Sequence, residues 1–212
     1  MTNFKRARTE EQIASRQREI LAACDEIYTE SGFDGVTLKA IATRTSISRP
    51  SIYNYYATKE EILLDILGQE YGKWCDELKE SFDQENTLTR EKFCQMLTNS
   101  LLRHEKMLKL MTINLNSIES KCGQEKLTQF KKDIFLYAGN LKNGLKKVFP
   151  SSTDPQQVLF MDAFFSYICG LYIYTHPSEK QLLAMQAAGF PEINSFEDLC
   201  YKGLEKLLLM LS

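Results

Sequence analysis

The sequence predicts an all-α protein, on three observations. The 212 residues include only 10 glycines and 5 prolines, which is too few for the many tight turns of β-sandwiches and barrels. Hydrophobic residues make up 43% of the chain, enough for a sizeable core, and this excludes the compositions of disordered and collagen-like chains. Apolar residues also recur at helical spacing along most of the length. We therefore expect a three-helix N-terminal domain joined to a larger helical domain.

The first predicted helix begins at a capping signal and ends at a glycine. Thr9–Gln12 has the pattern of a capping box, in which two side chains satisfy the free N–H groups at a helix start. Gly32 follows the apolar repeat, and glycine readily takes the left-handed conformation that ends helices. The residues expected on the buried face are Ile13, Ile20, Cys24 and Ile27.

Two short helices follow, joined by a polar turn. Thr37 can cap the second helix, and the third begins near Arg49–Pro50, where proline suits the first turn because its missing N–H would have no partner there. Between them, Thr45–Ser48 interrupts the apolar pattern. This spacing predicts a helix-turn-helix over residues 37–56, a motif whose second helix enters the DNA major groove. Tyr56 is expected in the core.

The rest of the chain is predicted to be helical too. A second capping box, Thr58–Glu61, opens a long helix whose apolar stripe reaches Leu78. Phe149–Thr153 is the clearest loop, and Gly189–Pro191 marks a turn. The further helices are expected over residues 89–103, 105–118, 122–148, 154–176, 178–188 and 195–211.

The charge is unevenly distributed along the chain. The 26 basic and 28 acidic residues give a net charge of −2, which alone argues against a nucleic-acid partner. Residues 1–9 and 37–59, however, carry seven basic residues and no acidic one, so the remainder sums to −9. Basic segments on an acidic body indicate a local surface for a polyanion. The basic residues are Lys5, Arg6, Arg8, Lys39, Arg44, Arg49 and Lys59.

Residues 16–67 closely resemble the TetR family of bacterial transcriptional regulators. The spacing agrees over about 50 residues, whereas the remaining three quarters resemble the family only in helical pattern and length. Ser46 departs from the glycine of many members, at a cost of about 1 kcal/mol if that residue needs a positive φ. The matching features are Gly32-Phe33, Val36-Thr37, Ile41-Ala42, Ile47-Ser48, the run Tyr53-Asn-Tyr-Tyr56 and Lys59-Glu60.

The resemblance implies a DNA-binding domain over residues 14–74 and an effector-binding and dimerisation domain over 75–212. It implies a cytoplasmic, nucleoid-associated homodimer that recognises a palindromic operator in double-stranded DNA. Repression is the commoner outcome in the family, with release by a small-molecule effector. The alternative is a helical protein-interaction module that keeps the fold and has lost DNA binding.

The residues expected to contact DNA lie in and around the helix-turn-helix. Arg49 is the principal candidate for a base contact, because a guanidinium can bridge guanine O6 and N7. Hydroxyl groups and Lys59 are expected on phosphates, and residues 5–8 can form an arm along the duplex. Lys39 and Arg44 fit the DNA backbone and plain solvation equally well. The predicted contacts are Thr37, Lys39, Ser48, Arg49, Pro50, Ser51, Tyr53, Tyr55 and Lys59.

In the larger domain, the resemblance implies a dimer interface on the two long C-terminal helices and a ligand cavity beside them. The helix over 158–175 is too apolar for one side to cover, and it is short and interrupted for a bilayer span. Interface candidates are Phe165, Ile168, Leu171, Tyr172, Leu204 and Leu208. Cavity candidates, whose Met-rich and aromatic character fits either an apolar or amphipathic effector or plain core packing, are Phe93, Met96, Met107, Met111, Asn114, Tyr137, Asn140 and Phe164.

Catalytic and metal sites find little support in the sequence. HExxH, GxSxG, P-loop and GxGxxG motifs are absent. The six cysteines form no CxxC pair and only two histidines occur, so a zinc cluster is not expected and the cysteines fit a reducing cytosol. We therefore expect neither an enzyme nor a bound cofactor or metal.

Overall fold

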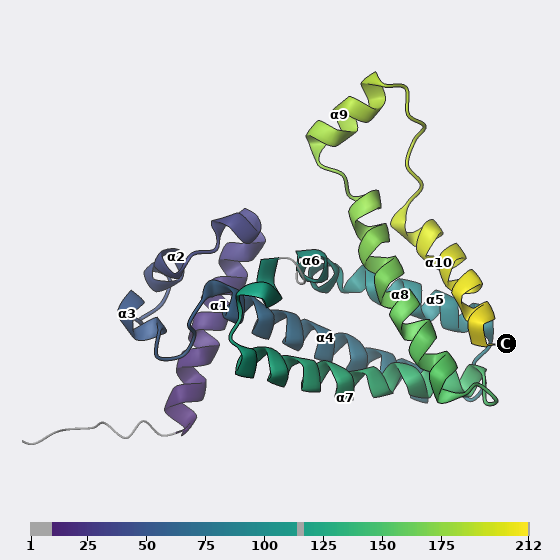
Figure 1. Ribbon diagram of the computed structural model, residues 1–212, viewed down its shortest axis with the longest axis horizontal. Helices are drawn as coiled ribbons and strands as arrows, with labels where there is room; N and C mark the ends of the chain where they lie inside the picture. Colours follow the sequence, from purple (N-terminus) through teal and green to yellow (C-terminus); the bar gives the residue numbers. More distant parts are fainter. Residues whose placement is uncertain (1–9, 114–116, 212) are drawn as a thin grey trace, which may run out of the picture. The chain divides into compact units, whose positions relative to one another are not determined.

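The structure is a computed structural model that describes residues 10–113 and 117–211. Every regular element within these ranges is a helix (Figure 1), as the composition predicts. Several sequence predictions lie outside the described residues. They concern Thr9 of the first capping box, the basic N-terminal residues Lys5, Arg6 and Arg8, and the cavity candidate Asn114.

The chain forms two compact units. In the described residues, the first comprises 10–68 and 117–131, and the second comprises 69–113 and 132–211. The first unit thus includes a segment from the second half of the sequence, which a single division at residue 74 does not anticipate.

The first unit is built from α1 (Glu10–Gly35), α2 (Leu38–Thr43), α3 (Arg49–Ile52) and the start of α4 (Lys59–Asp83). The helical course of α1 breaks at Gly32, which has φ 66° and ψ −168°, so the glycine lies where the sequence predicts the helix end. Thr37 caps α2 by accepting a hydrogen bond from the N–H of Ala40 at 3.0 Å. The short η2 (Glu119–Lys121) and the first residues of α7 (Gln124–Val148) complete the unit.

The core of the three-helix part is aliphatic and small. Its fully buried members include Ile20, Cys24, Ile27, Val36, Ile41, Ile47 and Ile52. Ile13 was predicted on the same face of α1, but it is 37% exposed. It lies about two turns before Ile20, beyond the end of this core, so the apolar period continues where the described neighbours leave the side chain exposed.

The second unit takes the remainder of α4 and α7 together with five further helical elements. These are α5 (Arg90–Arg103), α6 (Glu105–Ile113), α8 (Asp154–Thr175), α9 (Glu179–Ala187) and α10 (Phe196–Leu207), which continues as η3 (Leu208–Leu211). Helix α10 packs on α5 and α8, and α6 packs on α8. Of the helix expected over 105–118, the structure describes Glu105–Ile113 as α6, and residues 114–116 lie outside the described residues.

Aromatic side chains fill the core of the second unit. The Trp74 indole stacks on Phe164 with ring centroids 6.4 Å apart, and its Nε1–H donates to Ser100 Oγ at 3.0 Å. Phe82 stacks on Phe93 at 5.4 Å. A Cβ atom on Gly144 would lie 2.4 Å from the Phe82 ring, so α4 and α7 approach closely at this glycine. All of these contacts position the helices within the unit and leave α9 outside the core.

Candidate nucleic-acid interface

The helix-turn-helix presents the start of α3 to solvent and anchors its end. Pro50 lies in the first turn of α3, as the sequence predicts. After Ile52 the chain continues in turns, with the N–H of Tyr56 donating to the Ile52 carbonyl at 3.1 Å. Tyr56 is 2% exposed and its hydroxyl donates to Asp65 at 2.9 Å. Burial raises the pKa of Tyr56, and the residue is core, as expected.

The turn between α2 and α3 is held by two side chains of α1. The Glu19 carboxylate accepts the backbone N–H of Ser46, and Arg16 donates to the Ser46 hydroxyl. The bond from Ser46 is the main reason that the pKa of Glu19 is lowered. Ser46 does not adopt a positive φ, so the strain considered for a serine in place of glycine does not arise. Sequence reasoning missed this role, because an Arg and a Glu three residues apart occur on many helix surfaces.

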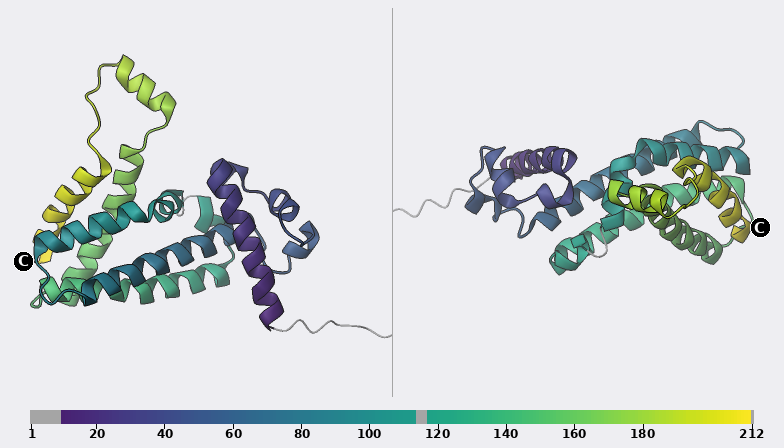
Figure 2. Two further views of the ribbon diagram at one scale, coloured as in Figure 1. Left: turned by 180° about the vertical axis from the view of Figure 1, so that it is seen from behind. Right: turned by 90° about the horizontal axis from the view of Figure 1, so that it is seen from above.

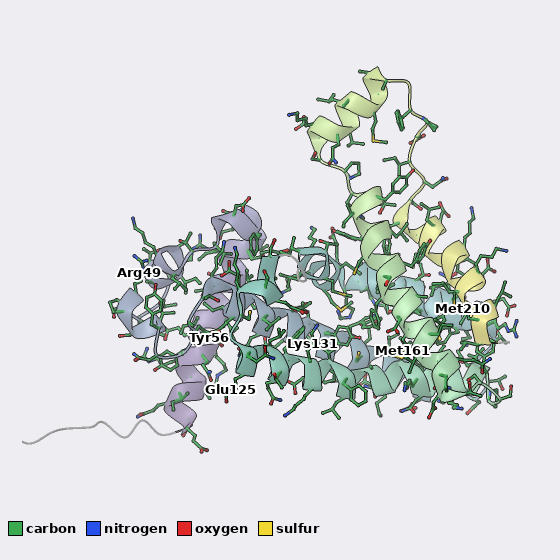
Figure 3. All side chains as sticks on the ribbon, in the orientation of Figure 1. Arg49, Tyr56, Glu125, Lys131, Met161 and Met210 are labelled. Carbon is green, nitrogen blue, oxygen red and sulfur yellow. The ribbon has the colours of Figure 1, made fainter. Side chains whose placement is uncertain are left out.

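The nine predicted DNA contacts occupy one region of the first unit and differ in exposure. Thr37, Lys39, Ser48, Arg49, Pro50 and Tyr53 are exposed, whereas Ser51, Tyr55 and Lys59 are half-buried. Figure 3 shows Arg49 at the outer side of α3, whereas Tyr56 lies on the inner side toward α4. Of the exposed set, Ser48, Arg49 and Pro50 lie at the start of α3, the part of a helix-turn-helix that meets base edges.

The four cations of residues 37–59 fall into two pairs. Arg49 and Lys39 form no ion pair or hydrogen bond with any residue in the described part of the chain. Arg44 instead donates hydrogen bonds to the Glu30 carboxylate, with Nη1 to Oε1 at 2.9 Å. These bonds raise the pKa of Arg44. Lys59 donates to the Phe33 carbonyl at 3.0 Å and lies over the Phe33 ring at 4.2 Å. Arg44 and Lys59 thus hold α1 to its neighbours, and Arg49 and Lys39 are left for a polyanion.

Two serines flank Arg49 in the sequence, and a hydrogen bond orients their hydroxyl groups. Ser48 and Ser51 share a hydrogen bond between their Oγ atoms at 2.9 Å, and Asn54 donates to the Ser51 carbonyl at 3.1 Å. Tyr53 is 52% exposed. A guanidinium among hydroxyls can bridge a guanine edge while the hydroxyls bind phosphate oxygens.

Acidic side chains at the start of α4 fix the end of the helix-turn-helix. The Glu61 carboxylate accepts a hydrogen bond from the N–H of Ala57 at 2.8 Å and another from the N–H of Gly123 at 3.1 Å. Thr58 Oγ1 accepts the Glu61 N–H at 3.2 Å, so half of the predicted capping box forms and the carboxylate bonds one residue further back. Asp65 pairs with Lys126. The segment before α7 therefore stabilises the chain directly after α3, a role that no local sequence pattern signals.

The predicted cavity residues are packed within the second unit. Phe93, Met107 and Phe164 are fully buried, and Met96, Met111, Tyr137 and Asn140 are half-buried. Asn140 donates to the Cys75 carbonyl at 3.2 Å, and the Tyr137 ring lies 6.4 Å from that of Tyr71. These residues line the interface of α4 and α7 or the core beside it, and their role toward a ligand stays a prediction.

The residues predicted at a dimer interface are mostly covered within their own chain. Ile168, Leu171, Tyr172, Leu204 and Leu208 are buried, and Phe165 is half-buried. These positions lie where α8 packs against α6, α10 and η3, and their role in a dimer interface stays a prediction. The apolar side chains that remain exposed on α8 and η3 are Val158, Leu159, Ile173, Tyr174, Leu209 and Met210.

Metal ligands do not gather in the described part of the chain, where no group of three or more His, Cys, Asp or Glu side chains could hold an ion. One helix, α8, is long and apolar enough to span a membrane by length and composition, and a third of that span is buried. Part of the apolar surface of α8 is thus buried in the core. Packing within the chain does not account for the part that stays exposed.

The fold and the site define a helix-turn-helix protein with a larger all-helical second unit. Comparison with known families identifies residues 20–66 as a match to the bacterial regulatory proteins of the tetR family. Residues 68–208 match the tetracyclin repressor-like C-terminal domain. The chain belongs to the TetR family.

Individual relatives match mainly in the N-terminal part. The HTH-type transcriptional regulator QacR of Staphylococcus aureus is 31% identical over 74 residues, 35% of this chain. The HTH-type transcriptional repressor KstR of Mycobacterium tuberculosis is 29% identical over 58 residues, 27% of this chain. The matches span 39% and 26% of the length of those two relatives.

Solved structures share the fold over nearly the whole chain. The repressor FadR of Thermus thermophilus, in complex with lauroyl-CoA, superposes with a TM-score of 0.61 at 21% identity, covering 93% of this chain and 95% of that one. FadR of Bacillus subtilis, in complex with stearoyl-CoA, gives 0.54 at 17% identity, with 92% and 97% covered. At these identities the likeness concerns the fold.

Proposed function

We propose that this protein is a sequence-specific DNA-binding transcriptional regulator, a repressor that acts in the bacterial cytoplasm. The observation that carries the proposal is the exposed start of α3, where Arg49 has no ion pair or hydrogen bond with the described residues and lies between Ser48 and Ser51 in a segment that has no acidic residue. Family membership supports it independently.

Arg49 and Lys39 provide a matched test, since both are exposed cations without a partner in the described chain. Arg49→Ala removes the base contact, and we expect it to cost about 1–3 kcal/mol of discrimination at one operator position. Lys39→Ala removes a phosphate contact, and we expect it to weaken all sequences alike. Fluorescence anisotropy with operators changed at single base pairs measures both. Equal losses on every sequence for the two variants would contradict the assigned roles.

We propose that the regulator works as a homodimer through α8 and its neighbour η3. The support is α8 itself, which carries only Asp154 and Asp162 as charged residues and is apolar on its exposed side as well as its buried one. A helix that is apolar all round requires cover on every face. A twofold axis would set the two α3 helices about 34–36 Å apart, one turn of DNA, on a palindromic operator.

We propose that an apolar or amphipathic small molecule releases the DNA, bound by the second unit. The Met-rich and aromatic character of its predicted lining supports this class, and the acyl-CoA esters in the two FadR structures make long-chain acyl-CoA the first compounds to test. A typical coupling of about 1–3 kcal/mol predicts an operator affinity about 5- to 150-fold weaker at saturating effector. Lauroyl-CoA and stearoyl-CoA are to be titrated against the preformed complex, with free coenzyme A as the control; an unchanged affinity would exclude this effector class.

A further inference from the structure

Residues 176–195 form an element of the second unit that buries almost nothing in its own protomer. Helix α9 has no buried residue, and in two opposite views it projects beyond the ends of α8 and α10 (Figures 1 and 2). We refer to residues 176–195 as the arm. Its large apolar side chains Leu182, Leu183 and Phe190 are 41%, 60% and 63% exposed.

The arm is nevertheless a defined structure with both helix ends capped. At the start, Ser178 and Gln181 form a reciprocal capping box, with the Ser178 N–H donating to Gln181 Oε1 at 2.8 Å. At the end, Gly189 has φ 73°, and the N–H groups of Gly189 and Phe190 donate to the carbonyls of Gln186 and Met185 at 3.1 and 3.0 Å. This is a Schellman motif. An isolated helix of nine residues is marginal in water even when well capped, so α9 requires tertiary cover.

A hollow lies within the arm, between α9 and residues 190–195, and Thr175 at the end of α8 closes it. Its volume is about 770 Å³, and its wall is mostly apolar. Pro177, Leu182, Met185, Phe190, Pro191 and Ile193 line it. The arm thus has two apolar sides, one toward this hollow and one outward through Leu183.

We propose that the arm packs against a second copy of this chain and thereby extends the dimer interface of α8 and η3. This inference rests on the proposed homodimer. The arm leaves α8 directly after the exposed Ile173 and Tyr174 and returns to α10, so it continues the same apolar surface. Its only charged residues are Glu179, Lys180 and Glu192, which excludes the phosphate backbone as its partner.

The exposed apolar area agrees with a second copy as the occupant. Of the 14 large apolar side chains that are exposed in the described chain, nine lie on α8, the arm and η3. At about half exposure, nine such side chains present on the order of 800 Å² of apolar surface to solvent. This is close to the accessible surface that one partner buries in a standard interface. Leu182, Leu183 and Phe190 supply about a third of this exposure, and without them the surface falls below that size.

The test compares two sets of substitutions in the full chain. The arm variant carries Leu182→Gln, Leu183→Gln and Phe190→Gln, and the control carries Phe135→Gln and Leu136→Gln on α7, where both residues are even more exposed. Sedimentation equilibrium measures the dimer dissociation constant, and circular dichroism checks that the helices are kept. We expect the arm variant to dissociate roughly a hundredfold more readily, because buried apolar anchors dominate interface energies, and the control to stay within about threefold of the parent.

A second measurement does not depend on weakening the dimer. With p-benzoylphenylalanine in place of Leu183, irradiation is expected to give a covalent product at twice the 24.5 kDa of one chain, and the same group at Phe135 is expected to give none. An arm variant as tightly dimeric as the parent, together with crosslinks confined to one chain, would overturn the inference. If the parent chain still dimerises and binds its operator, the proposed function stands; a monomeric parent that binds no operator overturns both.

Discussion

Lys59 has a structural environment that its position in the sequence does not reveal. Its ammonium group donates to the Phe33 carbonyl at 3.0 Å and lies 4.2 Å from the centre of the Phe33 ring. The side chain therefore joins the start of α4 to the end of α1. A role toward phosphate remains a prediction, and any such role comes in addition to this one.

Replacing Lys59 tests that structural role. Lys59→Met keeps the aliphatic stem and removes the charge, and we expect it to lower the free energy of unfolding by about 1 kcal/mol through the lost hydrogen bond and cation–π contact. Lys39→Met, at an exposed cation without a partner in the described residues, is expected to change stability by less than about 0.5 kcal/mol. Urea denaturation measures both, and equal effects would refute the assignment.

We expect Glu19 to make the stability of the helix-turn-helix depend on pH. Its pKa is lowered chiefly by the hydrogen bond from the Ser46 N–H. A carboxylate with a lowered folded-state pKa contributes stability that is present above its unfolded value, about 4.3, and is lost as the pH falls through the folded value. We expect Glu19→Gln to reduce stability at pH 7 and to flatten the decline below about pH 5. A parallel decline in parent and variant, followed by urea unfolding at several pH values, would contradict this.

At the scale of elements, helix α7 carries two glycines with opposite surroundings. A Cβ on Gly144 would lie 2.4 Å from the Phe82 ring, which is buried and stacked on Phe93 and so cannot retreat. A Cβ on Gly139 would meet nothing within 4 Å. The two positions share one helix, so intrinsic helix propensity affects both alike.

These two glycines give a matched prediction for the packing of α4 against α7. We expect Gly144→Ala to destabilise the protein by about 1–3 kcal/mol through overpacking. Gly139→Ala is expected to stabilise it by about 0.5–1 kcal/mol, the usual gain from replacing glycine within a helix. Thermal unfolding distinguishes them, and a stabilising Gly144→Ala would mean that α4 and α7 do not meet at this position.

The sequence was informative about elements wherever the signal is local. The cap at Thr37 and the break at Gly32 depend on neighbouring residues, and the structure has them where the pattern predicts. The helix expected from residue 105 is described over Glu105–Ile113, and residues 114–116, which would carry it further, lie outside the described chain.

A sequence pattern does not predict contacts between distant segments of the chain. The bonds of Glu19 to Ser46 and of Glu61 to Gly123 join residues 27 and 62 positions apart, and periodicity carries no information on such pairs. Periodicity also does not distinguish burial by the chain's own helices from burial by a second copy: Ile168 and Leu171, expected at a dimer interface, are buried within their own chain, and their role toward a second copy stays a prediction.

At the scale of the whole molecule, the charge distribution is sharper in the structure than in the sequence. The net charge of −2 conceals basic segments that sum to +7, and of the four cations in 37–59, Arg44 and Lys59 are used internally. Arg49 and Lys39 remain for a partner. We therefore expect each chain to make few but well-positioned charge contacts with DNA. A dimer would double their number, and the basic residues at the N-terminus would add to them.

Binding to DNA as a function of salt tests the central claim most directly. Fluorescence anisotropy is to be measured for a palindrome from upstream of the protein's own gene and for a scrambled duplex of the same composition, between 50 and 200 mM salt, a range over which phosphate contacts lose roughly 10³–10⁵ in affinity when 6–10 of them form. The account predicts that the palindrome binds at least about a thousandfold more tightly than the scrambled duplex, and that both affinities fall steeply with salt. Equal affinity for the two duplexes, or an affinity that salt leaves unchanged, would contradict it.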